Sequence, residues 1–326
     1  MKHNDPMKNK ASILLICGMA LLVSSCAKDS AVSPSSGTPS TDKEAIIRSV
    51  ESDSLGEMSS ADETVIDDGS PESLDKEATA IRPIRWGRRI VAVSRHINVD
   101  IIGDSIAIAT ITRTITGNFI IAAAYQDTSR WADTIITKPF SEQVVRKIRF
   151  RRIARTSSYL RNWIPVAITL VEGATQPDNA NLFEIRSIEY SFPWSTDTVT
   201  DPANTWLRFG RVMSGIPVLH IGDSVQVTLH VSSADPDTEL AVLRYMTNPV
   251  PVFGVRRVRM KLTGSLWNGT AYDRTYSATF YGALGIFTNV GRFNATVDVL
   301  SHGSLFDDAR PFSNRFWGLP YIVVRY

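Results

Sequence analysis

The sequence predicts a mainly β protein, in which an α+β first part, a helix plus an antiparallel sheet, precedes a β-sandwich. Two observations lead to this class. From Ile90 onward, short runs rich in β-branched residues alternate with Gly, Asn, Asp and Pro, about every ten residues. The second half of the chain shows no long stretch of helical periodicity. Frequent short strands separated by turn residues are typical of antiparallel sandwiches.

The N-terminus begins with a targeting segment. Lysines at 2, 8 and 10 precede an apolar run over residues 11–23. A run of about thirteen residues is too short to cross a bilayer, which needs roughly twenty, but it suits the apolar region of a signal peptide. The run ends at LVSSC, with Cys26, and small polar residues follow. These residues bury too little apolar surface to fold, so we expect residues 26–40 to form a flexible tether.

This order of basic, apolar, cysteine and polar segments resembles the signal peptide of bacterial lipoproteins. The resemblance covers residues 1–26 and implies that residues 1–25 are removed and that Cys26 carries the lipid. In this family an aspartate after the cysteine tends to retain the protein in the inner membrane. Ala27 stands there, so we expect attachment to the outer membrane, on its periplasmic or its outer face. Cys17 would leave with the leader, so no disulfide is expected.

Residues 41–175 form the expected first domain. Apolar residues at helical spacing after Thr41 predict a helix within residues 41–58. Residues 105–125 are predicted to be two strands joined at Gly117-Asn118, and residues 162–173 to be a strand that carries a tryptophan. A helix followed by such strands resembles the NTF2-like group, which implies an α+β cone.

The densest basic segment of this domain is VVRKIRFRRIAR, residues 144–155. Strand periodicity places Val144, Ile148 and Phe150 on one face. The other face then carries Lys147, Arg149 and Arg151. This basic stripe is either a solvated surface or an anion-binding site for lipid-A phosphates or an acidic polymer. The net charge of the whole chain is only +2, which gives no reason to expect a nucleic-acid partner.

Residues 176–326 form the expected second domain, after a loop-like stretch at 173–181. Alternation predicts strands at 224–231 and 291–300, the second with Phe293, Ala295, Val297 and Val299 inward, and a final strand at 320–326. This pattern resembles immunoglobulin-like and fibronectin-type sandwiches, although the Cys-Trp-Cys core is absent. The repeated IGDS at 102–105 and 221–224 predicts a Gly-Asp turn before a strand.

The sequence carries none of the common catalytic signatures. The sequence has no G-x-S-x-G, H-E-x-x-H, P-loop or Rossmann glycine pattern. Carboxylate pairs such as Glu184 and Glu189 could serve a glycosidase only if the fold brought them together. Alternating acids over residues 233–239 are consistent with a calcium loop or with an ordinary turn. We therefore expect no enzyme activity, no cofactor and no metal.

The remaining site predictions concern ligands at the surface. Trp267, Tyr272 and Trp317 are candidate stacking residues for sugars or for a partner chain. Ser30, within Asp-Ser-Ala, resembles the O-glycosylation acceptor of Bacteroidota. Together these features predict a non-catalytic, lipid-anchored envelope protein with a binding or structural role, whose partner is an envelope protein or a glycan. The alternative is a surface lipoprotein that binds or degrades carbohydrate.

Overall fold

The computed structural model describes residues 38–52, 66–67, 80–125, 131–177, 183–209, 215–246, 255–282 and 291–324. These residues form a mainly β fold with antiparallel sheets, which confirms the predicted class at this level. The helical elements are α1 (Asp42–Ser52), η4 (Tyr159–Arg161) and α3 (His302–Phe306). The strands are β1 (Ile66–Asp67), β2 (Arg82–Ile102), β3 (Ile106–Ala124), β4 (Thr134–Arg152), β5 (Trp163–Thr169), β6 (Val171–Thr175), β7 (Phe183–Ser191), β8 (Thr196–Val199), β9 (Trp206–Arg208), β10 (Val218–His220), β11 (Ser224–Ser233), β12 (Leu240–Met246), β13 (Val255–Arg259), β14 (Lys261–Trp267), β15 (Tyr272–Tyr281), β16 (Gly291–Leu300) and β17 (Asn314–Val324).

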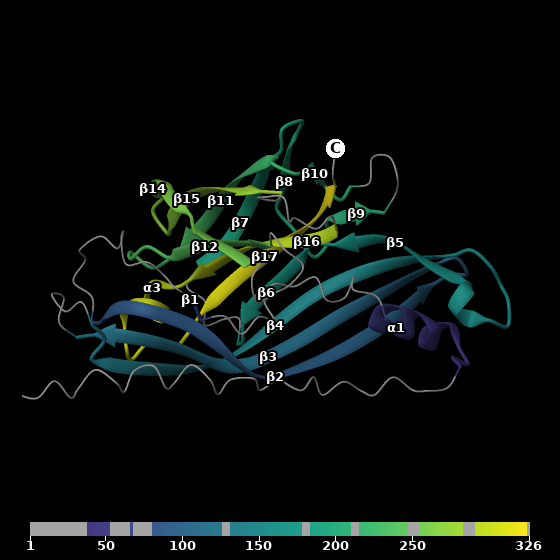
Figure 1. The fold of residues 1–326 in the computed structure, drawn as a ribbon, viewed down its shortest axis with the longest axis horizontal. Coiled ribbons are helices and arrows are strands. Elements are labelled where there is room, and N and C mark those ends of the chain that lie inside the picture. The colour runs from purple at the N-terminus through teal and green to yellow at the C-terminus, as the bar shows by residue number, and fades with distance from the viewer. Residues whose placement is uncertain are drawn as a thin grey trace, which may run out of the picture.

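Two sheets organise the described residues (Figure 1). The larger has the order β1-β2-β3-β4-β6-β17-β16-β12-β13, with β5, β9 and β10 attached beside this path. The smaller has the order β14-β15-β11-β7-β8. All strand pairs are antiparallel except β10 with β17. The larger sheet therefore includes strands from both sides of the predicted domain boundary at residue 175.

Strands β2, β3 and β4 form a long meander that runs along the molecule (Figure 1). Each has 19 to 21 residues, or roughly 60 Å of extended chain. The prediction of two strands around Gly117-Asn118 is wrong, because β3 continues through both residues. Gly117 is needed there for close packing rather than for a turn: a Cβ atom would lie 2.4 Å from the Arg89 carbonyl oxygen and 2.9 Å from the Phe140 ring.

The predicted helix is confirmed over residues 42–52, and the rest of its predicted range lies outside the described residues. Its first turn is capped by Thr41, whose Oγ1 accepts a hydrogen bond from the Glu44 backbone N–H at 3.2 Å. Ile46 and Val50 pack against the inner face of β2, β3 and β4. The helix therefore covers one end of the long meander (Figure 1).

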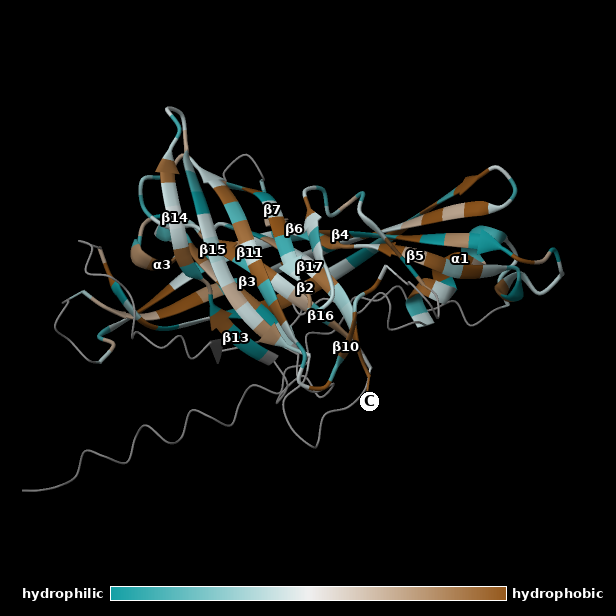
Figure 2. Ribbon diagram, turned by 90° about the horizontal axis from the view of Figure 1, so that it is seen from above, coloured by the Kyte–Doolittle hydropathy of each residue, from teal (hydrophilic) through white to brown (hydrophobic). Residues whose placement is uncertain are grey.

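The smaller sheet packs face to face on β12, β16 and β17. We call these two packed layers the sandwich. The predicted strand at 224–231 is confirmed as part of β11, and its four apolar side chains at 225, 227, 229 and 231 are buried between the sheets. Hydrophobic and polar residues alternate along it (Figure 2). The predicted Gly-Asp turns are also confirmed, since Gly103 and Gly222 have φ of 59° and 93°.

Strand β16 is buried on both faces. Phe293, Ala295, Val297 and Val299 face the smaller sheet as predicted. The residues between them, Asn294, Thr296 and Asp298, are also buried. A second hydrophobic cluster, which includes Trp86, Phe119, Leu300 and Phe316, covers that other face of the larger sheet.

The prediction of a single strand at residues 162–173 is wrong, because this segment forms two strands, β5 and β6. Strand β5 pairs with β4 over residues 148–152, and β6 then pairs with β4 over residues 142–145. The chain changes its second partner between β5 and β6. On the side away from β4, β5 pairs with β9, whereas β6 pairs with β17. Strand β6 therefore joins the long meander to the sandwich.

Candidate functional site

The described chain starts beside one end of the long meander. Arg152 Nη2 lies 2.7 Å from Asp42 Oδ2, and Trp163 Nε1 donates to Asp42 Oδ1 at 2.9 Å. The Arg152 guanidinium also lies over the Trp163 ring, 4.6 Å from its centre. These contacts fix the start of α1 to the end of β4. The predicted lipidation site Cys26 and glycosylation site Ser30 lie outside the described residues.

The basic strand has the predicted faces, with Val144, Ile148 and Phe150 buried and Lys147, Arg149 and Arg151 on the opposite face, although Arg146 is buried on the inner face. Two of these side chains contact residues just before or within β9. Lys147 Nζ donates to Asn204 Oδ1 at 3.2 Å, and the Arg149 guanidinium lies 4.3 Å from the centre of the Trp206 ring. Arg151 is exposed near the end of β4. Lys147 and Arg149 are therefore in contact with this segment, and anion binding by the three residues stays a prediction.

The predicted stacking residues lie in two different places. Trp267 and Tyr272 face each other across the hairpin of β14 and β15, with ring centres 4.8 Å apart, and Trp267 is 50% exposed. Trp317 is only 5% exposed and packs in the core between the sheets. An exposed tryptophan with a half-buried tyrosine beside it therefore lies at the hairpin, without Trp317.

The acidic loop at 233–239 is organised around an arginine. Arg274, 1% exposed, donates to the backbone oxygens of residues 235, 236 and 237 at 2.7 to 2.9 Å, and to Glu239 Oε1 at 2.7 Å. Tyr276 Oη donates to the other oxygen of Glu239 at 2.9 Å. A guanidinium group thus supplies the positive charge that a bound cation would supply. This finding favours the turn over the calcium loop.

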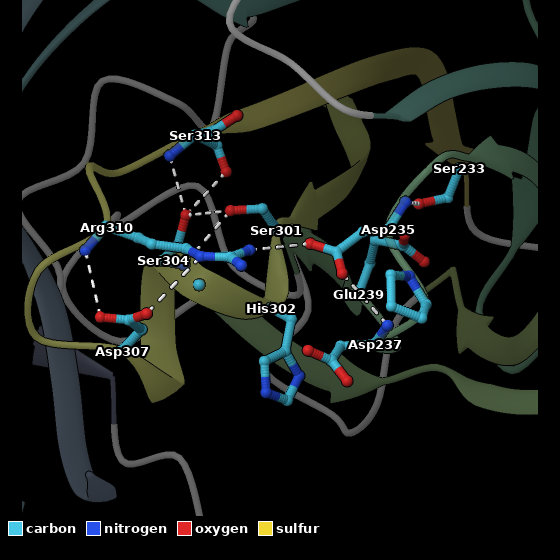
Figure 3. A network of polar contacts seen from close by, with 12 residues as sticks. Ser233, Asp235, Asp237, Glu239, Ser301, His302, Ser304, Asp307, Arg310 and Ser313 are labelled. Carbon is cyan, nitrogen blue, oxygen red and sulfur yellow. Dashed lines mark hydrogen bonds and ion pairs between the residues drawn. The ribbon is translucent and has the colours of Figure 1, made fainter. Parts of the chain in front are cut away.

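Figure 3 shows how the loop after β16 meets this acidic loop. Arg310 reaches from one to the other, with Nη1 3.1 Å from Asp235 Oδ2 and Nε 3.5 Å from Asp307 Oδ2. Ser301 caps α3 by accepting a hydrogen bond from the Ser304 backbone N–H at 3.2 Å. Ser304 in turn bonds to the backbone of Ser313. The network holds two connecting segments together.

Lys138 lies beneath the same segment. Its Nζ donates to the backbone oxygens of Gly303, Ser304 and Asp307 at 2.8, 2.9 and 2.5 Å. Burial lowers the pKa of Lys138 to about 8, although Asp307 and the neighbouring Asp308 oppose this shift. Lys138 therefore acts as a buried cap for the end of α3.

A buried charge network joins strands far apart in the sequence. Arg88 on β2 places Nη1 3.1 Å from Glu142 Oε1 and Nη2 2.5 Å from Asp298 Oδ2. Arg244 on β12 reaches the same Asp298 oxygen at 2.7 Å, and Asn314 Nδ2 donates to Asp298 Oδ1 at 3.0 Å. Burial raises the pKa of Glu142, against the opposing effect of Arg88. Because the network is buried inside the protein, it holds the strands in one arrangement rather than binding a ligand.

Sequence reasoning missed this network because alternation placed Asp298 on a solvent-facing side. A single acid within an otherwise apolar strand, as in TVDVL, was the available signal. Its partners are 54 or more residues away, except Asn314. No local pattern could identify them.

A small cavity of about 170 Å³ lies between β6, β7 and β17. Its lining includes the side chains of Glu172, Glu184, Asp201, Arg315 and Trp317. Glu184 therefore shares this cavity with acids other than Glu189, which is five residues along β7 and roughly 17 Å away. The sequence-based pair is not brought together.

Three of the four histidines after residue 25 contact different residues. His220 Nδ1 lies 3.4 Å from Asp223 Oδ2, His230 contacts Thr275 Oγ1, and His302 stacks on Phe306. Among the described residues, no group of three His, Cys, Asp or Glu side chains could hold a metal ion. Neither of the described α-helices is long and apolar enough to cross a membrane.

Comparisons with family models, with curated proteins and with solved structures found no match for this chain.

Proposed function

We propose that this protein is a non-catalytic, lipid-anchored component of the bacterial cell envelope, held at the outer membrane through Cys26. The observation that carries the proposal is the order of segments before the folded part: basic residues, an apolar run of signal-peptide length, a cysteine and a polar tether. The contacts of Asp42 with Arg152 and Trp163 support it, because they give such a tether a firm attachment to the folded part.

The buried polar groups support a structural or binding role. The side chains of Arg88, Arg274 and Lys138 are directed at carboxylates or backbone oxygens of the protein itself. These contacts connect strands and loops. A rigid β scaffold of this kind suits a protein that presents a surface to an envelope partner.

A matched pair of cysteine variants tests the anchor. Cells producing Cys26→Ser or Cys17→Ser would be grown with an alkyne fatty acid, and the purified proteins would be assayed for label. We expect Cys17→Ser to be labelled like the wild type, because residue 17 leaves with the leader, and Cys26→Ser to lose the label. Equal labelling of both variants would contradict the proposal.

Carbohydrate binding is the second candidate function, and the exposed Trp267 ring beside Tyr272 favours it. An exposed tryptophan ring with a half-buried tyrosine ring beside it provides an apolar surface on which sugar rings can stack. A glycan array would test it with wild type, Trp267→Ala and Trp194→Ala, since Trp194 is another exposed tryptophan, at 53%. Binding that is lost only in Trp267→Ala would favour this function. An array without signal for the wild type would count against it.

At the level of fold families, the proposal assigns residues 176–326 to an immunoglobulin-like sandwich and residues 41–175 to an NTF2-like α+β unit. The face-to-face packing of the two sheets supports the first assignment. The packing of α1 on the long antiparallel strands supports the second.

A further inference from the structure

The end of the long meander next to α1 carries an exposed apolar patch. We call it the tip patch and define it as Ile102, Ile106, Arg151, Ile153 and Leu160. The four apolar side chains are 54%, 38%, 54% and 43% exposed, in that order. Ile102 pairs with Ile106 across the hairpin of β2 and β3, and Ile106 pairs with Arg151 on β4. Ile153 bonds through its backbone N–H to the Asn162 carbonyl, directly after η4.

The charges around the tip patch are mixed, with an excess of arginine. Arg151 and Arg161 are exposed. Arg155 forms an exposed ion pair with Asp104 in the hairpin turn. Asp100, on β2, accepts a hydrogen bond from Asn98. Isoleucine and leucine side chains next to arginines suit the boundary between lipid headgroups and acyl chains, where apolar groups enter the bilayer and guanidinium groups meet phosphates.

The proposed anchor reaches the folded part at this same end. Asp42 is paired with Arg152, which lies between Arg151 and Ile153 in the sequence and points to the opposite face of β4 from Arg151. Cys26 is twelve residues before Thr38, the first described residue. Such a chain spans about 20 Å on average and about 40 Å when fully extended. The lipid would therefore lie within a short distance of the tip patch.

The opposite end of the meander is much farther from the anchor. Ile135, 74% exposed, lies 16 residues before Arg151 along β4, which corresponds to roughly 50 Å. While α1 stays in place, a tether that spans about 20 Å on average keeps the lipid nearer to the tip patch than to that end. Of the two ends, the tip patch is therefore the one that lies next to the proposed anchor.

We propose that the tip patch docks on the bilayer that holds the acylated Cys26, with its isoleucines in the interfacial layer and Arg151 at lipid phosphates. The inference rests on the proposed lipid anchor and extends it: the tether and the tip patch together would fix the orientation of the protein. The long axis of the meander then points away from the membrane, and the far end near Ile135 projects into the envelope space.

Site-specific fluorescence tests this orientation. The mature chain has no cysteine besides Cys26, which acylation blocks, so Ile153→Cys or Ile135→Cys provides a single reactive thiol. Each lipidated variant would be labelled with an environment-sensitive dye and reconstituted into vesicles of phosphatidylethanolamine and phosphatidylglycerol, with or without a nitroxide-labelled lipid. We expect a blue-shifted emission, at least about twofold quenched by the nitroxide, at position 153, and a water-like, unquenched emission at position 135.

The other outcomes overturn the inference in distinguishable ways. Water-like emission at both positions, with the protein still in the vesicles, would mean that the protein is anchored but its tip does not dock. A blue shift at position 153 that increases with the density of protein on the vesicles, with no quenching by the nitroxide, would place a second copy on the tip patch. Labelling of two thiols per chain, with no protein in the vesicles, would instead reject the lipid anchor itself. In a further variant, Ile153→Cys with Ile106→Glu and Arg151→Glu, we expect the quenching at 153 to be lost while the circular dichroism spectrum is unchanged.

Discussion

Asp298 is only 1% exposed, and its side chain contacts side chains from three other strands. Its carboxylate meets Arg88, Arg244 and Asn314. In Asp298→Asn the size is kept but the charge that faces two buried guanidinium groups is lost. Breaking a buried ion pair costs about 3–5 kcal/mol, so we expect a loss of this size in the free energy of unfolding.

Urea unfolding would measure this loss, and Asp104→Asn is the matched control. It makes the same chemical change in an ion pair with Arg155 whose side chains are 67% and 72% exposed. Exposed pairs contribute about 0–1 kcal/mol. Similar small losses for both variants would contradict the role given to the buried network.

Lys138 gives a prediction about pH. Its pKa is lowered from 10.5 to about 8 by burial, so between these values the unfolded chain binds more protons than the folded one. The free energy of unfolding therefore gains a contribution that rises with pH across this window and is absent below pH 8. In Lys138→Met this contribution should vanish. Urea titrations at pH 7.5 and 9.5 would check it, and an equal pH response in both proteins would refute it.

Strand β6 depends on a glycine at its contact with β17. A Cβ atom on Gly173 would lie 2.1 Å from the Phe316 ring. We expect Gly173→Ala to destabilise the protein by about 1–3 kcal/mol through overpacking. The control is Gly264→Ala in β14, where the nearest atom is 3.9 Å away, so only a small change is expected.

A double variant tests whether the contact with Phe316 causes the destabilisation by Gly173→Ala. Phe316→Leu should make room for the new methyl group, so Gly173→Ala should cost less in that background. Thermal or urea unfolding of the four proteins would give the coupling. Additive losses would show that the clash with Phe316 is not the cause.

The strands differ in how well the sequence predicts them, for physical reasons. Strand β11 was predicted because burial of one face imposes a period of two on its side chains. In β16 the same pattern misled about Asp298, because the other face of the sheet is covered as well. Gly117 was taken for a turn because its close contact with Phe140 depends on tertiary packing. Of the candidate sites, the lipidation motif is local and visible in the sequence, whereas the tip patch requires the positions of β2, β3, β4 and η4.

At the scale of the molecule, one sheet connects the long meander to the sandwich. Strand β6 pairs with β4 on one side and with β17 on the other, and Arg88 on β2 reaches Asp298 on β16. We therefore expect the two parts to unfold in one cooperative transition. Hydrogen exchange at increasing urea, followed by mass spectrometry, should show peptides of β3 and β11 losing protection together. Loss of one set well before the other would contradict this expectation.

The lipid anchor is the central claim, and the mature N-terminus tests it most directly. Trypsin cleaves after Lys28, so the purified protein should yield a short peptide of Cys26, Ala27 and Lys28. Mass spectrometry of protein extracted from membranes is predicted to find this peptide carrying a diacylglycerol group on the cysteine, with residues 1–25 absent. An unmodified Cys26, or a chain that retains the leader, would contradict the account.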